Sequence, residues 1–412
     1  MQQKWLVLAA ASLIFFFLNG ATFASLGVVL YSMIRDLHWS QTEGGMSFSI
    51  LGIACGVASP LPALLMRRFG CRRVVVLGGL CLTAGFALAF ATSGLPAFDL
   101  AMVLLGLGYA LAGNIPGVYL IASWFPHSSR RAIGFYLMLG AAGNVIGPPL
   151  VAAVVASSHS WRFNWLLMGI VAAAITLLCL IVLRDAPGTA GSADGPVAVA
   201  APGSAASRTG LIPWRDRDAM LTRQFLLVAT SMTLTIAGVT TNSSVAVTHL
   251  VHLGMTPAFA AFILSLVALI ATLAKGLAGR LSENVRPSRV LAAGLLLQGV
   301  GDIAFSGGRG GSVLGDYTFA CAFGVGWGLS YVAANLVLLD YFGREVGARI
   351  LSVVWMVSTL AAAGPVAAGI IADRFGSFSP IFVLYAALLL AVALPIFLMR
   401  GPPVRAAREV VA

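Results

Sequence analysis

Lys275 is the residue whose type and position point most directly to chemistry. It ends the otherwise apolar run Val267–Lys275. A cation inside a bilayer costs a few kcal/mol or more unless it faces a cavity or a counter-charge. Ala271 lies one helical turn before it, so the same helix supplies no acidic neighbour there. Lys275 is therefore a candidate to bind an anionic substrate. The alternative is a structural lysine that reaches toward the interface or pairs with a carboxylate.

Three further charged residues suggest coupling or gating. Arg280 lies about 7.5 Å beyond Lys275 along a helix, and Glu283 follows it at the spacing of a helical ion pair. We expect an inner gate or a structural role for Arg280. Asp302 is the best-placed carboxylate inside an apolar run. It is a candidate for proton coupling, with structural hydrogen bonding as the alternative.

Polar side chains form a layer near the predicted depth of Lys275. Amide and phenol groups facing lipid are costly, so we expect them to face the interior. They would bind substrate there or form interhelical hydrogen bonds, and Tyr119 would add an aromatic wall. The candidate substrate-binding residues besides Lys275 are Asn19, Asn114, Tyr119, Asn144, Asn242, Tyr331 and Asn335.

The sequence offers no catalytic set. We find no Ser/His/Asp arrangement, paired carboxylates or metal ligands at a common depth, and no phosphate-binding loop. The five cysteines form no C-x-x-C pair and are expected to pack as small apolar residues. We therefore expect neither an enzyme nor an ATP-driven pump, with no metal and no cofactor.

The composition places the candidate residues in a membrane. The chain has 412 residues, of which 59% are hydrophobic and 9% charged, with a mean hydropathy of +0.95. A soluble globular protein carries about 25% charged residues, so a chain with so few could not cover a water-facing surface. The apolar residues come in runs of about 20, enough to span a bilayer as helices. The sequence thus predicts a multi-pass membrane protein.

Twelve spanning helices can be placed along the chain. The stretch 184–222 is rich in Ala, Gly, Ser and Pro and is predicted to be a linker. It separates six helices in residues 1–183 from six in residues 223–412. The predicted spans are 5–34, 44–66, 74–93, 97–123, 132–156, 163–183, 224–248, 258–281, 290–306, 314–339, 349–371 and 379–399.

Lysine and arginine predict the orientation. Of the 25, 19 fall on the side of the termini and the linker, 4 on the other side and 2 inside the eighth span. Positive charge favours the cytoplasm, so we expect both termini and the linker to be cytoplasmic in a bacterial inner membrane. The net charge of +11 is then an orientation signal, and no nucleic-acid partner is expected. The expected partners are the lipid bilayer and a small organic anion that is the substrate. We expect the transporter to be a monomer.

The two halves repeat each other at an offset near 217 residues. Gly147-Pro148 corresponds to Gly364-Pro365, and Trp124-Phe125 corresponds to Tyr341-Phe342. Gly106-x-Gly108-Tyr109 returns 218 residues later as Gly324-x-Gly326-Trp327. The same offset relates Asn114 to Tyr331, so we expect these two residues to face each other across a central cavity. Each half has an even number of spans, so the copies run in the same direction, as the halves of major-facilitator transporters do.

The chain resembles the major facilitator superfamily over nearly its whole length. The loop Arg67-Arg68-Phe69-Gly70-Cys71-Arg72-Arg73 is similar to the family's D-R-x-G-R-K/R-x signature, with Arg67 in place of the acid. The stretch from Trp124-Phe125-Pro126 to Arg130-Arg131-Ala132 and Gly134 resembles the monocarboxylate and oxalate:formate branch, as does His38-Trp39-Ser40. The resemblance implies an all-α membrane protein with twelve helices in two six-helix bundles, and helices one, four, seven and ten lining a cavity.

The same resemblance bears on Lys275. Monocarboxylate transporters carry D-x-x-x-R in helix eight, with the arginine four residues before the signature glycine. Counting back from Gly279 places Lys275 at the arginine and Ala271 at the acid. The implied function is secondary transport of a small organic anion, expected to be a monocarboxylate, by alternating access. Proton symport and anion antiport both remain open.

An exporter of drugs or other amphipathic compounds is the alternative. Gly134, Gly143 and Gly147-Pro148 match the pattern G-x8-G-x3-G-P that accompanies antiporters. Drug:proton antiporters usually carry an arginine in helix four, where this chain has Met102. The sequence therefore favours the anion transporter.

Overall fold

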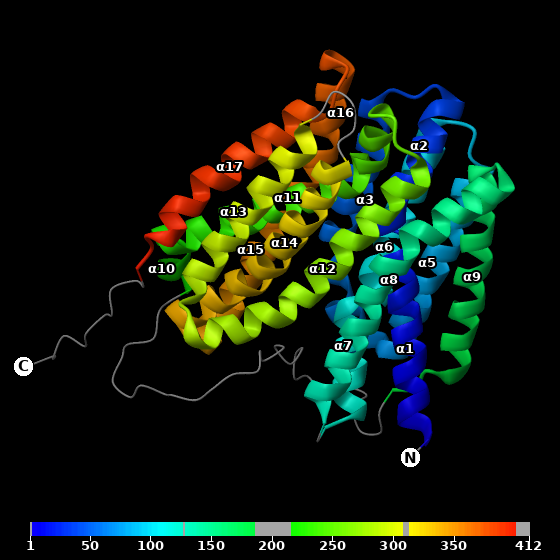
Figure 1. Ribbon diagram of the computed structural model, residues 1–412. Coiled ribbons are helices and arrows are strands. Elements are labelled where there is room, and N and C mark those ends of the chain that lie inside the picture. Colours follow the sequence, from blue (N-terminus) through cyan, green and yellow to red (C-terminus); the bar gives the residue numbers. More distant parts are fainter. Residues whose placement is uncertain (1, 127, 186–215, 308–312, 401–412) are drawn as a thin grey trace, which may run out of the picture.

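The computed structural model describes residues 2–126, 128–185, 216–307 and 313–400. These residues are helical with short connections, and Figure 1 shows two groups of long helices side by side. The linker predicted at 184–222 lies outside the described residues between 186 and 215. The first group contains α1 (Gln2–Ala21), α2 (Phe23–Leu37), α3 (Gln41–Ala58), α4 (Leu61–Phe69), α5 (Cys71–Ala91), α6 (Leu95–Ala112), α7 (Asn114–Trp124), α8 (Ser129–Ser158) and α9 (Trp161–Val182). The second contains α10 (Asp216–Met220), α11 (Arg223–His252), α12 (Pro257–Asn284), α13 (Pro287–Ser306), α14 (Val313–Phe342), α15 (Arg344–Val357), the 3-10 helix η1 (Ser358–Ala362), α16 (Ala363–Phe375) and α17 (Ser379–Phe397).

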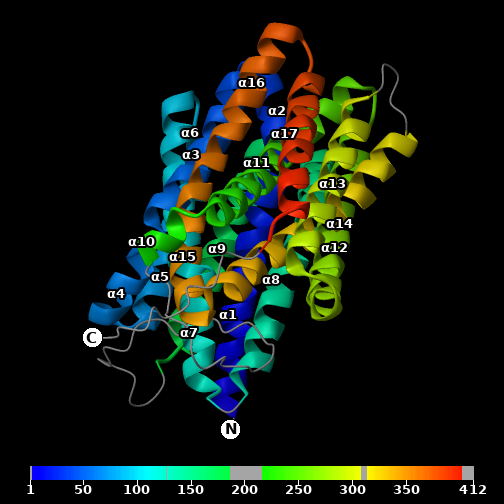
Figure 2. The same cartoon turned by 90° about the vertical axis from the view of Figure 1, so that its left-hand side faces the viewer.

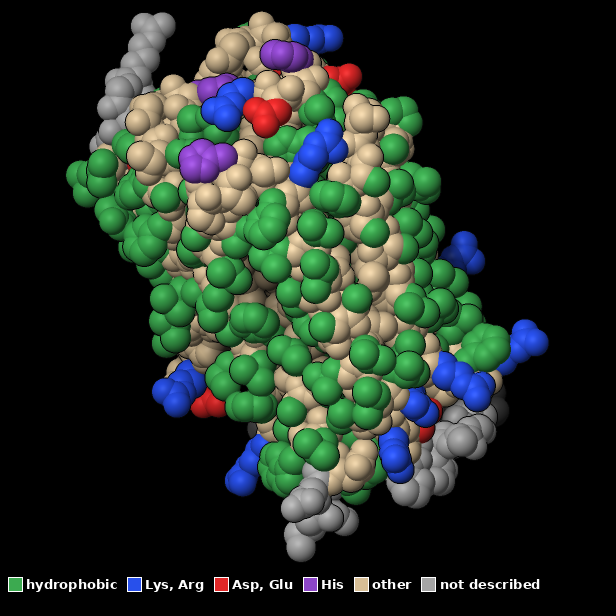
Figure 3. All heavy atoms as spheres, turned by 90° about the vertical axis from the view of Figure 1, so that its right-hand side faces the viewer, with side chains coloured by type: hydrophobic (Ala, Val, Ile, Leu, Met, Phe, Trp, Pro, Cys, Tyr) green, Lys and Arg blue, Asp and Glu red, His purple; other side chains and the backbone are tan. Residues whose placement is uncertain are grey.

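The helices are long and apolar enough for twelve membrane spans. Eleven helical segments are each long and apolar enough to cross a membrane, and α3 and α4, bent by 49° relative to each other, together form the twelfth span. The prediction of an all-α protein with twelve spans is confirmed. Hydrophobic side chains dominate the middle of the face in Figure 3, and most charged side chains lie toward its two ends. This is the distribution that a lipid environment requires.

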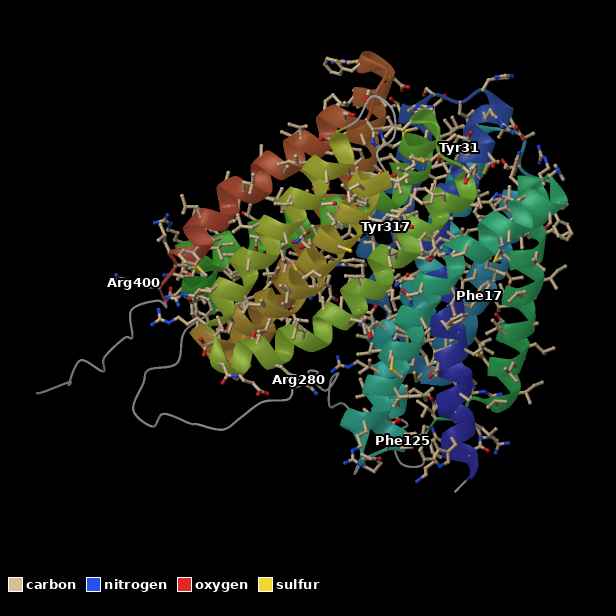
Figure 4. The ribbon with its side chains drawn as sticks, viewed as in Figure 1. Phe17, Tyr31, Phe125, Arg280, Tyr317 and Arg400 are labelled. Atoms are coloured by element: carbon tan, nitrogen blue, oxygen red, sulfur yellow. The ribbon has the colours of Figure 1, made fainter. Side chains whose placement is uncertain are left out.

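We name the two ends of the molecule by the chain segments that they carry. The terminal face holds the start of α1 and the end of α17, and the opposite face holds the α2–α3 and α16–α17 turns (Figures 1 and 2). In Figure 4, Phe125 lies in the lower part near the start of α1, Arg280 at the lower end of α12, Arg400 at the left where α17 ends, and Tyr31 near the top.

Matching glycines make matching helix contacts in the two groups. A Cβ on Gly106 would lie 2.7 Å from the Leu51 oxygen of α3, and one on Gly108 would lie 2.8 Å from the Gly78 oxygen of α5. In the second group, Gly324 meets α12 and Gly326 meets α13 in the same way. Such distances leave no room for a side chain, so the glycines permit close packing. The spacing found in the sequence thus corresponds to equivalent contacts in space.

Several predicted spans are interrupted. The first breaks at Thr22, where the hydroxyl of Thr22 donates to the Leu18 oxygen at 2.5 Å and the hydroxyl of Ser25 donates to the Gly20 oxygen. The fourth breaks at Gly113, whose oxygen accepts a 3.0 Å hydrogen bond from the Tyr136 hydroxyl. Hydroxyl groups that bond to the backbone compete with the helix ladder in this way. The sequence predicted continuous helices here.

The hydrophobic core is continuous between the groups only on one side. One cluster of buried residues joins helices of the first group to the opposite-face parts of α11, α12, α14, α16 and α17. A second cluster contains only residues of the second group and occupies its terminal part. The groups therefore share a core near the opposite face and are packed separately near the terminal face.

Candidate functional site

The backbone around Lys275 is fixed by two glycines of α14. A Cβ on Gly324 would lie 3.0 Å from the Val267 oxygen, and one on Gly328 would lie 2.6 Å from the Ala271 oxygen and 2.9 Å from the Lys275 nitrogen. These glycines are four residues apart and so lie on one face of the helix. They form a groove that holds α12 against α14. The groove determines where the Lys275 side chain begins.

The Lys275 ammonium lies over two aromatic rings of α14. Its Nζ is 4.5 Å from the centre of the Trp327 ring and 4.9 Å from that of Tyr331. Trp355 of α15 packs edge-on against Tyr331, with the ring centres 5.5 Å apart. Each such ring attracts a cation by about 0.5–2 kcal/mol. Among the described residues, no carboxylate forms an ion pair with Lys275. The rings thus stabilise the ammonium only in part, and it retains the capacity to bind an anion.

Lys275 lies at the boundary between the two hydrophobic clusters. Trp327 packs against the cluster that joins both groups of helices, whereas Tyr331 packs against the cluster confined to the second group. Among the described residues, Gly276 and Gly279, further along α12, have nothing within 4 Å of a Cβ position, and neither has Gly134 of α8. The cation therefore lies where the core shared by the two groups ends along α12.

Arg280 and Glu283 are exposed near the terminal end of α12 (Figure 4). Within the described part of the chain, no ion pair joins them. The helical spacing that allowed a pair is therefore not used in this structure. Their proposed gating role remains a prediction.

One predicted polar residue of the first group, Asn19, forms its hydrogen bonds within that group. The Asn19 amide donates to the Phe15 oxygen at 2.8 Å, and the Tyr109 hydroxyl donates to the Asn19 side-chain oxygen at 3.0 Å. Phe23 packs edge-on against Tyr109, at 5.1 Å between ring centres. Asn19 thus joins α1 to α6, and sequence reasoning did not identify Tyr109 as its partner.

The other polar candidates of the first group are more open. Asn114 is exposed at the start of α7, directly after the break at Gly113. Tyr119 and Asn144 are half-buried. Among the described residues, no hydrogen bond joins any of the three to Lys275. In this conformation, the structure does not bring them into contact with the cation.

In the second group, Tyr331 is the predicted residue that touches Lys275. Asn335 lies one turn beyond Tyr331 and donates to the Tyr331 backbone oxygen at 2.5 Å. Its side-chain oxygen is left for another donor.

Asn242 and Asp302 meet in a buried site between α11 and α13. The Asn242 amide donates to Oδ1 of Asp302 at 3.4 Å. Asp302 is fully buried, and among the described residues neither its Oδ2 nor the Asn242 side-chain oxygen has a hydrogen-bond partner. One turn along α13, Gln298 donates to Ser330 at 2.8 Å and to Thr235 at 3.3 Å. A buried carboxyl oxygen without a partner is costly as an anion. The proton-coupling role expected of Asp302 remains a prediction. Sequence reasoning missed Gln298.

The described residues contain no group of three or more His, Cys, Asp or Glu side chains arranged to hold a metal ion. The five cysteines are free.

Comparisons with known proteins agree with this architecture. The sequence profile of the Major Facilitator Superfamily matches residues 12–363 and 228–411. Rat monocarboxylate transporter 3 is 28% identical over 396 residues, covering 92% of this chain and 76% of the relative. Rat monocarboxylate transporter 4 is 24% identical over 401 residues, covering 93% and 81%.

Solved structures show the same fold at low identity. The nucleoside transporter NupG superposes with a TM-score of 0.74 at 14% identity, covering 97% of this chain and 100% of that one. A bacterial homologue of the human lysosomal transporter Spinster, in an inward-facing and occupied conformation, gives 0.73 at 15% identity, covering 97% of each chain. With its twelve spans, repeated glycine contacts and superfamily match, this chain belongs to the Major Facilitator Superfamily of secondary transporters.

Proposed function

We propose that this transporter carries a small organic anion, and that the anion is a monocarboxylate bound at Lys275. The observation that carries the proposal is the Lys275 ammonium, which lies over Trp327 and Tyr331 without an acidic partner among the described residues. The similarity to monocarboxylate transporters over most of the chain supports the choice of substrate. An ammonium group offers three donors to a carboxylate, and the flanking rings exclude water around them.

The other polar residues complete the site when the halves close around the substrate. In the present conformation, the anion reaches Lys275 from the terminal face, where the halves are separate. Closure of that face brings the first group toward the cation. In the proposal, Asn19, Asn114, Tyr119 and Asn144 then orient the anion from one side, and Asn242, Tyr331 and Asn335 from the other. Arg280 and Glu283, near the terminal end of α12, form the gate that closes behind it.

Coupling is assigned to Asp302. Its buried carboxyl group lies on α13, away from the α12–α14 groove that holds Lys275, and one of its oxygens lacks a partner. A proton bound at Asp302 would travel with the anion in symport, and the same carrier would exchange one anion for another in antiport. The transporter is proposed to work as a monomer without a cofactor.

The terminal face is proposed to be cytoplasmic, in a bacterial inner membrane, because lysine and arginine concentrate on that side of the sequence. Reporter domains fused after residue 412 and within residues 186–215 should then both be active only in the cytoplasm. An external signal from either fusion would reverse the orientation. The conformation described here would in that case face outward.

The chain provides a matched test of the anion site, because Lys4 is its only other lysine. Lys4 also lies over two rings, at 5.8 Å from Trp5 and 5.6 Å from Phe125, but at the terminal end of α1. Uptake of labelled monocarboxylates into proteoliposomes should fall more than about thirtyfold in Lys275→Ala, because truncating one member of a buried charge pair costs about 2–5 kcal/mol. Lys275→Arg should keep part of the activity, and Lys4→Ala nearly all of it.

Unchanged uptake by Lys275→Ala would overturn the anion site. A second panel of amphipathic cations tests the alternative of a drug exporter, which the glycine pattern of α8 favours. In the structure, Gly143 and Gly147 bring α8 against the backbone of α1 at Phe16 and Gly20. Transport of those cations, undiminished in Lys275→Ala, would establish the exporter in place of the anion carrier.

A further inference from the structure

Four arginines gather around the terminal end of α17, away from the transport site. Two neighbouring cavities lie there, of about 230 and 390 Å³, and they share Leu398, Met399 and Arg400. Figure 4 shows Arg400 at the end of α17. The first cavity is lined by Arg286, Ser288, Arg289, Phe397, Leu398, Met399 and Arg400. The second is lined by Arg223, Gln224, Leu227, Leu394, Pro395, Leu398, Met399 and Arg400.

The described lining of the cavities is positively charged. Among the described residues, no acid lines either cavity and none of the four arginines forms an ion pair. The arginines are held in place by other contacts. Arg289 lies over the Phe397 ring at 5.8 Å, and Gln224 donates to the Arg400 backbone oxygen at 3.2 Å.

The corresponding region of the first helix group, at the end of α9, differs in charge. Asp185, after α9, accepts a 3.0 Å hydrogen bond from the Arg72 backbone nitrogen at the start of α5. The Arg72 guanidinium donates to the Leu180 oxygen at 2.5 Å. An acidic side chain therefore lies among the cations at that end of the first group. The described residues that line the cavities at the end of α17 include no such acid.

The helices around these cavities add to the positive charge. Arg223 is the first residue of α11, and Arg286 caps the start of α13. Helix N-termini carry a partial positive charge and favour anions. Cations placed there repel the helix ends and one another, and an anion in the cavities would relieve this repulsion.

Apolar side chains border the arginines on the side of the membrane. Leu394, Phe397 and Leu398 are 63%, 52% and 67% exposed. They belong to the last turns of α17 and its cap, within or next to a segment long and apolar enough to span a bilayer. A soluble anion would leave these side chains uncovered, whereas acyl chains would cover them.

We propose that these two cavities bind the headgroup of an anionic glycerophospholipid, with its acyl chains over Leu394 and Leu398. Basic pockets between spanning helices at the cytoplasmic side suit such headgroups. The guanidinium groups would bind phosphate oxygens in pairs. Sharing of Arg400 between the cavities fits a lipid with two phosphates, such as cardiolipin, better than one with a single phosphate. The site is independent of the transported substrate.

Native mass spectrometry of the purified, full-length protein tests the proposal. Cardiolipin, phosphatidylglycerol and phosphatidylcholine are added separately, and the lipid-bound fraction is measured. Cardiolipin should be retained most strongly and phosphatidylcholine least. Arg286→Gln/Arg289→Gln/Arg400→Gln should weaken cardiolipin binding by about a hundredfold, because each of the three arginines near an anionic surface contributes about 1 kcal/mol.

The matched control removes three arginines from the terminal face of the first group. Arg68→Gln/Arg73→Gln/Arg131→Gln alters exposed residues and should leave cardiolipin binding within about twofold of the wild type. Equal losses in both triple variants, or equal retention of cardiolipin and phosphatidylcholine by the wild type, would overturn the site. Displacement of cardiolipin by millimolar inorganic phosphate would also overturn it, in favour of a soluble phosphate site.

A measurement on the wild type covers the case in which the triple variant fails to fold. A cardiolipin analogue with a photoreactive group near its phosphates should crosslink to peptides containing residues 286–289 and 394–400. Crosslinks confined to other peptides would contradict the proposed position.

Discussion

The two ends of the interface between the helix groups differ in how closely the backbones approach. Near the opposite face, a Cβ on Gly27 would overlap the Ser243 oxygen, and one on Gly45 would overlap the Pro365 oxygen. Near the terminal face, Gly134 and Gly276 have nothing within 4 Å of a Cβ position. Glycines therefore permit direct backbone contact near the opposite face. Near the terminal face, Gly134 and Gly276 take part in no such contact among the described residues.

This difference explains how the present conformation is held. At the opposite face, α2 packs against α11 and α3 against α16 with hardly any side-chain volume between them. Closely packed surfaces have few intermediate arrangements. The groups are thus either in contact or apart at that end. Lys275 lies where the shared core ends, so its access depends on which end is closed.

A carboxylate strengthens the closed end. Asp373 of α16 accepts hydrogen bonds from the backbone nitrogens of Gln41 and Thr42, at 3.0 and 2.8 Å, and from the Thr42 hydroxyl at 2.5 Å. These groups form the first turn of α3. An anion at a helix N-terminus is favourable, and here the anion comes from the other helix group. Asp373 therefore connects the two groups only while the opposite face is closed.

The largest expected effect comes from placing the same side chain at each end of the interface. Gly27→Ala should force α2 away from α11, because its Cβ would overlap backbone atoms that have no rotamer to change. Overpacking of this kind costs about 1–3 kcal/mol, which shifts the balance of states by about fivefold to a hundredfold. Gly276→Ala meets open space and should leave this conformation unaffected.

Spin labels report the outcome. Labels at positions 35 and 374 measure the opposite face, and labels at 131 and 284 the terminal face, in a background whose native cysteines are replaced. Gly27→Ala should lengthen the first distance and shorten the second. If Gly27→Ala and Gly276→Ala gave the same distances as the parent protein, close backbone contact would not set the state.

The sequence predicted the features that depend on composition and on local spacing. Twelve spans follow from apolar runs, and the contacts of Gly106 and Gly324 follow from a repeat that can be counted along the chain. The break at Gly113 has a local signal that the predicted span did not use, because Pro116 three residues later has no N–H for the helix ladder. The Tyr136 hydroxyl, which bonds to the Gly113 oxygen from another helix, has no such signal. The Asp373 contact joins residues more than 330 positions apart, and no local pattern links them.

The sequence predicted the central residue of the candidate site, Lys275, better than it predicted the residues that contact it. Lys275 stood out because a charge in an apolar run is costly, whatever surrounds it. Trp327 appears in the sequence only as part of the glycine repeat, because a ring beside a cation has no sequence signal of its own. Asn242 and Asp302 lie 60 residues apart, and each was singled out as a buried polar residue without its partner being known.

The second prediction concerns the empty carrier, which must change from the state closed at the opposite face to the state closed at the terminal face. A bound monovalent anion neutralises Lys275, whereas the empty carrier must close the terminal face over an unpaired cation. Burying that cation costs a few kcal/mol, and the two rings offset only part of it. Exchange of anion for anion in proteoliposomes should therefore exceed net uptake by about tenfold, the factor given by a residual cost of 1–2 kcal/mol. Equal rates would show that the unpaired lysine does not hold the carrier back.

A smaller effect is expected from Asp302, which lies nearer the closed end than Lys275 does. Asp302→Asn removes the proposed proton site but keeps the shape of the side chain. Net uptake driven by a pH gradient should fall a few-fold, and its dependence on pH should weaken, whereas anion exchange should change little. Asp99→Asn is the control, because Asp99 is a half-buried carboxylate that already accepts a 2.6 Å hydrogen bond from Ser47. An unaltered pH dependence in Asp302→Asn would remove Asp302 from the coupling mechanism.

The smallest effect is expected at the Asp373 contact. Asp373→Asn keeps one acceptor oxygen but loses the charge that favours the N-terminus of α3. For an exposed group this interaction is worth about 0.3–1 kcal/mol, so the terminal-open state should lose a factor of about two to five in population. Asp185→Asn is the matched control, because Asp185 caps α5 from within the same helix group. It should lower thermal stability without changing the distances between spin labels. The Asp373 contact crosses the interface between the groups and the Asp185 contact does not. A shift of similar size in both variants would therefore mean that helix capping in general, and not this connection between the groups, biases the closed end.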